Sequence, residues 1–149
     1  MTDKVIHKTC TVSCSVADAW KKWTTHEGLQ TFFGRDNKIE LQPGGAFEIY
    51  FMMDKPYGLR GSEGCKVLSF LPERMFSFTW NAPPHFEQIR AGSVYTWVVV
   101  NFYAEENGKT KIELHHLGWH EGEQWQAVYD YFDKAWEQVL NGLVKSCEP

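Results

Sequence analysis

The sequence lacks the features that mark nucleic-acid-binding proteins and membrane-spanning proteins. Lysine and arginine together number 15 against 19 acidic residues, for a net charge of -4, and no segment gathers them into a basic stripe. Such stripes bind phosphate backbones, so we expect no nucleic-acid partner. The longest apolar runs, such as residues 97–100, are far shorter than the ~20 residues that cross a bilayer, so no membrane span is predicted. Residues 1–4 carry an acid and no apolar segment, which predicts no secretion signal and a cytoplasmic location.

Motifs of covalent and cofactor chemistry are also missing. The sequence holds no G-x-S-x-G nucleophile turn, P-loop, dinucleotide fingerprint or HExxH helix. We therefore predict no cofactor and favour binding over catalysis, with enzyme activity left open. The four cysteines form no CxxC pair. Cys10 and Cys14 lie on one predicted strand about 13 Å apart, too far for a disulfide, so reduced thiols are expected.

Aromatic residues, by contrast, are abundant. They make up 15% of the sequence, including seven tryptophans and ten phenylalanines. The chain has the length of one domain and can bury roughly two thirds of the surface that its unfolded form exposes. No linker, repeat or low-complexity segment divides it. We predict a single domain over residues 1–149.

The first third of the sequence predicts a strand followed by two short helices. Residues 5–14 are rich in β-branched side chains and alternate loosely, as an opening strand does. Ser15 and Asp18 are spaced as in a capping box, which predicts a helix start. Thr25 can cap a second short helix, which Gly34 is expected to end.

The middle of the chain predicts antiparallel strands joined by turns. Turn-forming residues recur at 43–45, 55–58, 71–72, 82–84 and 106–108. Apolar residues alternate along the segments between these turns, so one face of each strand should point inward. Three acidic residues alternate with the inward set and are expected to face solvent: Glu40, Glu48 and Glu113.

A long amphipathic helix is predicted from Gly122 onward. Apolar residues recur there at i, i+3, i+4 and i+7 as far as Leu143. Such a helix has about 20 or more residues and a length of about 30 Å, enough to cover a sheet. The predicted fold class is therefore α+β, with a curved antiparallel sheet, two short helices and a long C-terminal helix.

This arrangement predicts either a solid aromatic core or a cavity between the sheet and the long helix. A curved sheet held away from one helix leaves space unless every inward side chain is large, and apolar hollows are the usual form of small-molecule sites. The residues expected to line such a ligand site are Trp20, Phe47, Ile49, Phe51, Phe76, Phe78, Trp80, Val98, Val100, Leu114, His116, Tyr129, Phe132 and Trp136.

A series of motifs runs through nearly the whole chain in a fixed order. The motifs lie at residues 19–24, 32–34, 41–47, 67–80 and 110–119. They resemble the family typified by the C-terminal domain of the activator of heat-shock-protein-90 ATPase, within the START-like, birch-pollen-allergen-like (SRPBCC) superfamily. The resemblance implies a helix-grip fold, whose cavity in relatives receives hydrophobic ligands. Phe32 and Ala135 depart from the family pattern, which usually has Trp and Gly at these positions.

Histidines form the densest polar cluster, at residues 115–121. Adjacent residues of a strand point to opposite faces, so His115 and His116 cannot easily share a metal, and no metal site is predicted. His116 falls on the inward face. It is the one candidate for an acid or base, and the alternative is a core histidine with satisfied hydrogen bonds.

Three functions remain open at this point. The first is binding of a small hydrophobic or aromatic molecule in the cavity. The second is a protein-interaction module, with a chaperone or a second copy of the chain as partner, because Tyr95, Trp97 and Val99 make the strand at 94–102 apolar on its other face as well. The third is an enzyme of the polyketide-cyclase or hydrolase kind with His116 as its acid or base, since the same fold hosts both.

Overall fold

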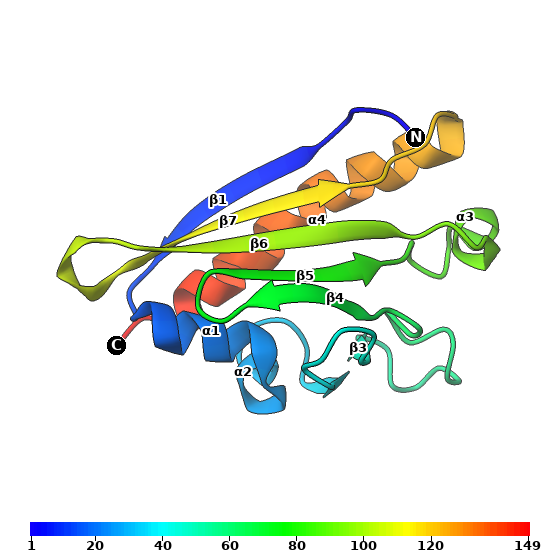
Figure 1. Ribbon diagram of the computed structural model, residues 1–149. Helices are drawn as coiled ribbons and strands as arrows, with labels where there is room; N and C mark the ends of the chain where they lie inside the picture. The colour runs from blue at the N-terminus through cyan, green and yellow to red at the C-terminus, as the bar shows by residue number, and fades with distance from the viewer.

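The computed structural model describes all residues, Met1–Pro149. A five-stranded antiparallel sheet has the order β1-β7-β6-β5-β4, and β2 and β3 form a second, two-stranded sheet (Figure 1). The elements in chain order are β1 (Ile6–Val12), α1 (Val16–Thr24), α2 (His26–Gln30), β2 (Asp36–Ile39), β3 (Phe47–Tyr50), β4 (Val67–Leu71), β5 (Met75–Trp80), α3 (Glu87–Ala91), β6 (Thr96–Ala104), a 3₁₀ turn (Glu106–Gly108), β7 (Thr110–Leu117) and α4 (Glu123–Ser146).

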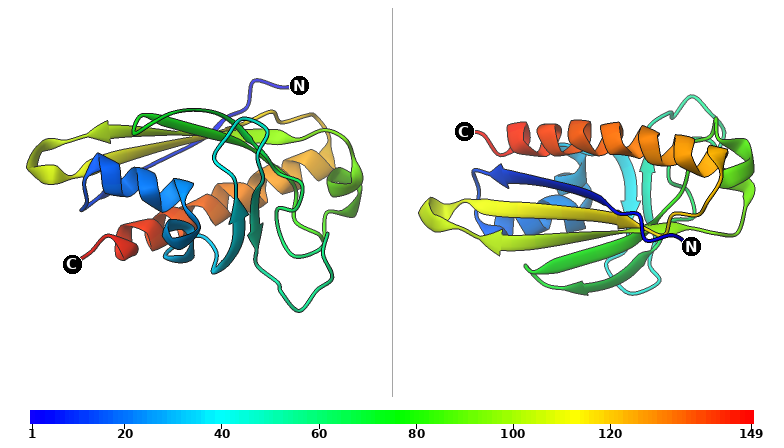
Figure 2. Two further views of the ribbon diagram at one scale, coloured as in Figure 1. Left: turned by 60° about the horizontal axis from the view of Figure 1, so that its bottom comes forward. Right: turned by 90° about the horizontal axis from the view of Figure 1, so that it is seen from above.

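Helix α4 lies across one face of the large sheet, as the sequence predicted. Figure 2 shows the helix running along the sheet, with α1 and α2 at the end where α4 finishes. The ammonium group of Lys8 on β1 ties the edge of the sheet to the helix, at 3.1 Å from Asp133 and 2.9 Å from Glu137. The predicted α+β class is therefore confirmed. None of the helices is both long and apolar enough to cross a membrane.

The two short helices begin where their capping residues predict. The Ser15 hydroxyl accepts a hydrogen bond of 3.1 Å from the Asp18 N–H, and the Thr25 hydroxyl accepts one of 3.0 Å from the Gly28 N–H. Helix α2 ends at Gln30, earlier than the Gly34 boundary expected from the sequence. The Phe33 N–H returns to the Leu29 carbonyl at 2.9 Å. A turn therefore replaces the last part of the expected helix.

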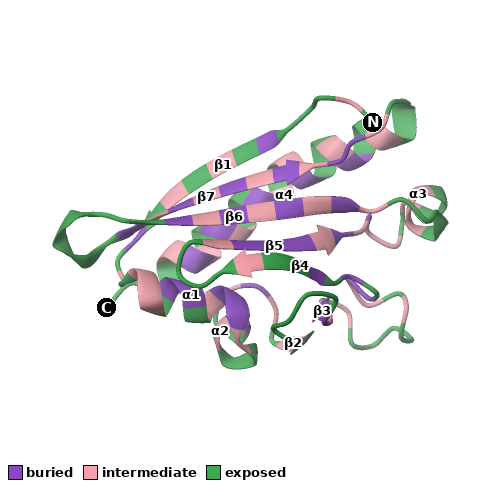
Figure 3. Cartoon of the chain, viewed as in Figure 1, coloured by how far each residue is buried: buried purple, intermediate pink, exposed green.

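The core lies between the large sheet and α4. Buried and more exposed residues alternate along β6 and β7, as Figure 3 shows in purple and pink. Beneath the helix, aromatic rings fill the centre of the concave face, with the ring centroids of Phe47 and Phe78 only 4.2 Å apart. Towards α1, Trp20 packs edge-on against Phe102 at 5.5 Å. Most of the concave side is therefore solid.

Candidate ligand pocket

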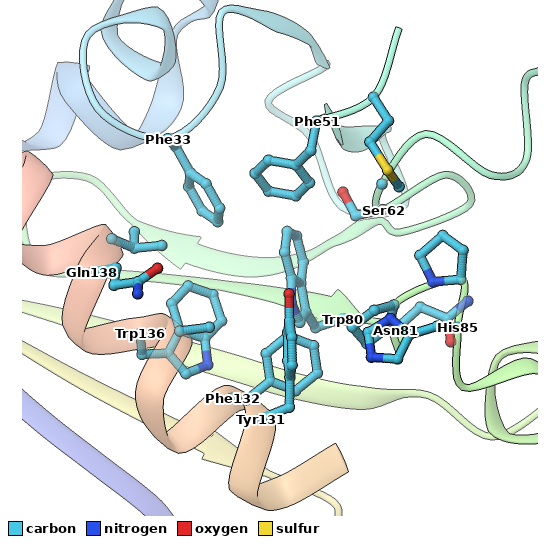
Figure 4. Close-up of a pocket in the computed structure, with 16 residues that line it drawn as sticks. Phe33, Phe51, Ser62, Trp80, Asn81, His85, Tyr131, Phe132, Trp136 and Gln138 are labelled. Atoms are coloured by element: carbon cyan, nitrogen blue, oxygen red, sulfur yellow. The ribbon is translucent and has the colours of Figure 1, made fainter. Parts of the chain in front are cut away.

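A cavity of about 410 Å³ remains at one end of the concave face. It lies between α4, the end of β5 and the segments that follow β3 and β5 (Figure 4). Its aromatic wall consists of Phe33, Phe51, Trp80, Tyr131, Phe132 and Trp136, and Ser62, Asn81, His85 and Gln138 supply polar groups.

Three aromatic rings in mutual contact form one side of this pocket. The centroid of Phe33 lies 5.4 Å from that of Trp80 and 5.7 Å from that of Trp136, and the two indoles are 5.7 Å apart. Such centroid spacings are those of favourable aromatic pairs. Each ring comes from a different element, namely the turn after α2, β5 and α4, so the site depends on the whole fold.

The pocket takes in only part of the residue set predicted from the sequence. Phe51, Trp80, Phe132 and Trp136 line it. The remaining residues of the predicted set do not: Trp20, Phe47, Ile49, Phe76, Phe78, Val98, Val100, Leu114 and His116 are buried in the core, and Tyr129 packs against Trp119. Strand alternation identifies the side to which a residue points, but not how far along that side the space stays open.

Several lining residues were missed, and the α4 sequence held a signal for some of them. Tyr131, Ala135 and Gln138 are spaced by four and three residues, so they form one stripe beside the buried stripe of the helix. Phe33 was expected at the end of a helix and instead projects from the turn after α2. His85 lies in the segment before α3, a helix that sequence patterns did not predict.

His116 is fully buried, and both of its ring nitrogens have partners. The Trp136 indole N–H donates to Nδ1 at 2.9 Å, so Nε2 carries the proton and donates to the Thr96 hydroxyl at 2.7 Å. That hydroxyl in turn donates to the Trp80 carbonyl at 3.0 Å. Burial lowers the pKa of His116 to about 3 and keeps the ring neutral. The ring links the two pocket tryptophans and leaves no nitrogen free for a substrate.

A buried ion pair joins α3 to the loop after β3. The Glu63 carboxylate lies 3.3 Å from the Arg90 guanidinium of α3. It also accepts hydrogen bonds from the backbone N–H groups of Gly58, Arg60 and Gly61. Burial alone would raise the pKa of Glu63, but the backbone donors outweigh it and lower the pKa. Arg90 also donates to the carbonyls of Ala82 and Gly58, each at 2.7 Å, so it ties α3 to the loop after β3.

The expectation that Glu48 faces solvent was wrong. Its side chain is only 7% exposed and accepts hydrogen bonds from the hydroxyls of Tyr50 at 2.7 Å and Tyr57 at 2.8 Å. The hydrogen bond to Glu48 raises the pKa of Tyr57 to about 12. The Gly64 N–H also donates to this carboxylate, at 3.1 Å. The chain after β3 folds back over Glu48, and strand alternation cannot reveal this cover.

The model of one protein family matches residues 13–148, almost the entire chain. The chain belongs to the Activator of Hsp90 ATPase homolog 1-like family. The resemblance drawn from the sequence motifs is thereby confirmed. No curated protein gave a significant match.

Solved structures of similar proteins share the fold of this Activator of Hsp90 ATPase homolog 1-like chain. A Mesorhizobium loti protein has a TM-score of 0.75 at 17% identity, over 96% of each chain. The Aha1 dimer from Colwellia psychrerythraea has a TM-score of 0.69 at 19% identity, over 97% of this chain and 96% of that one. An HSP90 activator from Plasmodium falciparum has a TM-score of 0.67 at 15% identity, over 93% and 92% of the two chains. At these identities the likeness shows the fold alone.

Proposed function

We propose that the protein binds a small hydrophobic or aromatic molecule in the pocket beside α4. The observation that carries this proposal is the contact of Phe33, Trp80 and Trp136 beside an open volume of about 410 Å³. That volume falls within the roughly 300–1,000 Å³ of small-molecule sites, which are mostly apolar with a few polar groups. The rest of the concave face is packed, so the pocket is a local feature of an otherwise solid core.

The polar groups at the pocket's edge favour a ligand with an apolar body and a polar end. Asn81, His85 and Gln138 can donate or accept hydrogen bonds there. Burying about 200 Å² of apolar ligand surface contributes on the order of 5 kcal/mol before the cost of ordering the ligand. Contacts between ligand and aromatic faces add to this.

We expect Ala135→Trp to weaken ligand binding by tenfold or more. Ala135 lines the pocket from the middle of α4, so the indole would occupy the volume that a ligand needs. A tenfold weaker affinity corresponds to about 1.4 kcal/mol. This is less than the free energy of ligand burial that the indole would prevent. The probe is 8-anilinonaphthalene-1-sulfonate, titrated by fluorescence, with native mass spectrometry to detect a co-purified molecule.

Lys134→Trp is the matched control for this experiment. It adds the same side chain to the same helix at an exposed position outside the pocket, so it should leave probe binding unchanged. Thermal unfolding of both variants checks that each one folds. Equal probe affinity in the two variants, together with no co-purified molecule, would show that the pocket is not the binding site.

A second candidate function is regulation of a chaperone ATPase. Family membership and the likeness to an HSP90 activator favour it. The outer face of β6 offers Trp97 as a contact. Part of its ring packs on Gly118, where an added Cβ would lie 2.7 Å away.

We expect Trp97→Ala to reduce stimulation of purified Hsp90 ATPase, and Tyr103→Ala, at the far end of β6, to leave it unchanged. An ATPase rate that an excess of the unmodified protein does not alter would remove this candidate.

A further inference from the structure

Two histidines and a glutamate meet on the outer face of the large sheet, opposite α4. His7 of β1 pairs directly with His115 of β7, and Glu113 lies two residues before His115 on the same face. One potential ligand atom from each of the three side chains lies within 4.8 Å of the others. This is the one group of three or more such side chains in the structure. It lies apart from the pocket and its tryptophans.

The cluster joins parts of the sequence that no local pattern connects. The expectation of no metal site rested on His115 and His116 pointing to opposite faces. They do so here, since His116 is buried in the core while His115 lies on the outer face. The second imidazole comes instead from β1, the edge strand that pairs with β7.

The spacing of the cluster suits a divalent metal ion. Bonds of 2.0–2.1 Å in a tetrahedral zinc site place neighbouring ligand atoms about 3.3 Å apart. His7 Nε2 and Glu113 Oε2 are already 3.4 Å apart. The rings of His7 and His115 are stacked, at 7° with centroids 4.5 Å apart, so their nitrogen lone pairs run parallel and one ring must rotate before both nitrogens face the same ion. The potential ligand atoms already lie within 4.8 Å of one another.

We propose that His7, Glu113 and His115 form a binding site for Zn²⁺ or a related divalent transition-metal ion. Imidazole nitrogens favour these ions, whereas Ca²⁺ and Mg²⁺ prefer sets of oxygen ligands alone. Three protein ligands leave a fourth, open position for water. Lys111 lies 4.0 Å from Glu113 and is 44% exposed, so it can move towards solvent when the ion takes its place. The ion would fasten the edge strand β1 to β7.

Zinc titration of the tag-free protein tests the site. Calorimetry with ZnCl₂ should give one binding event, and the imidazole NMR signals of His7 and His115 should respond while the other four of the six histidines stay in place. His7→Gln, His115→Gln and Glu113→Gln should each weaken binding by roughly tenfold or more, because each removes one of three ligands. His7 and His115 lie outside the core, so the two histidine variants should keep the circular dichroism spectrum of the unmodified protein.

Two controls separate this site from other ways of holding zinc. His26→Gln alters an exposed imidazole elsewhere and should leave the affinity unchanged. Cys147→Ser removes a thiol that competes for soft metals, and Co²⁺ bound in place of Zn²⁺ should show no thiolate charge-transfer absorption. Zinc binding that survives both histidine substitutions, or that disappears in Cys147→Ser, would overturn the proposal.

Discussion

Oxidation of the purified protein with diamide will join Cys14 to Cys147 and raise the free energy of unfolding. The two sulfur atoms lie 3.1 Å apart, and both residues are accessible in part. Cys14 precedes α1 and Cys147 follows α4, so the bond would close a loop across almost the entire chain. Loop-closure entropy gives roughly 5 kcal/mol as an upper bound for a ring of this size, less any strain in the native state.

The reaction should be slow at neutral pH. Burial, and to a smaller extent the hydrogen bond to Cys147, raises the pKa of the Cys14 thiol to about 12. The thiolate is the reactive form, so the rate should increase about tenfold per pH unit in mildly alkaline solution. Diamide accepts the two electrons and two protons that the thiols release. Two measurements follow the outcome. The intact mass should fall by two hydrogen atoms, and urea unfolding before and after treatment gives the change in stability.

Single substitutions identify the thiols that react. Cys147→Ser should abolish the stabilisation, whereas Cys65→Ser, at a fully buried position, should preserve it. Cys10→Ser tests whether Cys10 competes with Cys14 for Cys147. Burial, and to a smaller extent the charge of Cys147, raises the pKa of the Cys10 thiol to about 11. An oxidised protein with no cross-link in its peptide map, or with an unchanged urea midpoint, would contradict the prediction.

The second large effect is a loss of stability in mild acid that depends on His116. Burial lowers its pKa in the folded protein to about 3, while an unfolded histidine titrates near 6.5. Below about pH 6.5 the unfolded chain therefore binds a proton that the folded chain refuses, and stability falls as pH decreases towards 3. At about 1.4 kcal/mol per pH unit, the two units between about pH 6.5 and about pH 4.5 make the loss from this one group on the order of 3 kcal/mol.

Comparison with His116→Gln isolates this contribution from that of the acidic residues. The glutamine amide can accept from the Trp136 indole and donate to Thr96, and it does not titrate. Urea unfolding at a series of pH values should show a shallower decline for the variant below about pH 6.5. His26→Gln, at an exposed site, should follow the unmodified protein. If the plots of unfolding free energy against pH were parallel for all three proteins, the folded protein would bind a proton at His116 as readily as the unfolded chain does, and the prediction would be wrong.

Local sequence patterns were sufficient to predict most of the fold. Ser15 and Thr25 cap the helices that they were expected to cap, and the apolar repeat after Gly122 became the 24-residue helix α4. Helix α3 escaped prediction because its five residues include none that is buried, so it has no apolar period. Periodicity detects an element only when one of its faces is packed against the core.

The sites were harder to predict because they depend on contacts between distant residues. Strand alternation correctly put Phe47 and Trp80 on the inward face. The space stays open beside Trp80 and is filled around Phe47 because of how β5, the turn after α2 and α4 pack together. The cover over Glu48 and the pairing of His7 with His115 arise in the same way. Each of these needs the tertiary arrangement, which no local period contains.

The buried pair of Arg90 and Glu63 has a consequence for the folding of the segments around it. Arg90 contacts the Glu63 carboxylate and the carbonyls of Ala82 and Gly58, so one side chain holds together three stretches that are distant in the sequence. Removing the guanidinium would leave the Glu63 carboxylate buried without its counter-ion, which is costly. A substitution of Arg90 should therefore loosen α3 and the loop after β3 together, while the large sheet and α4 keep their packing.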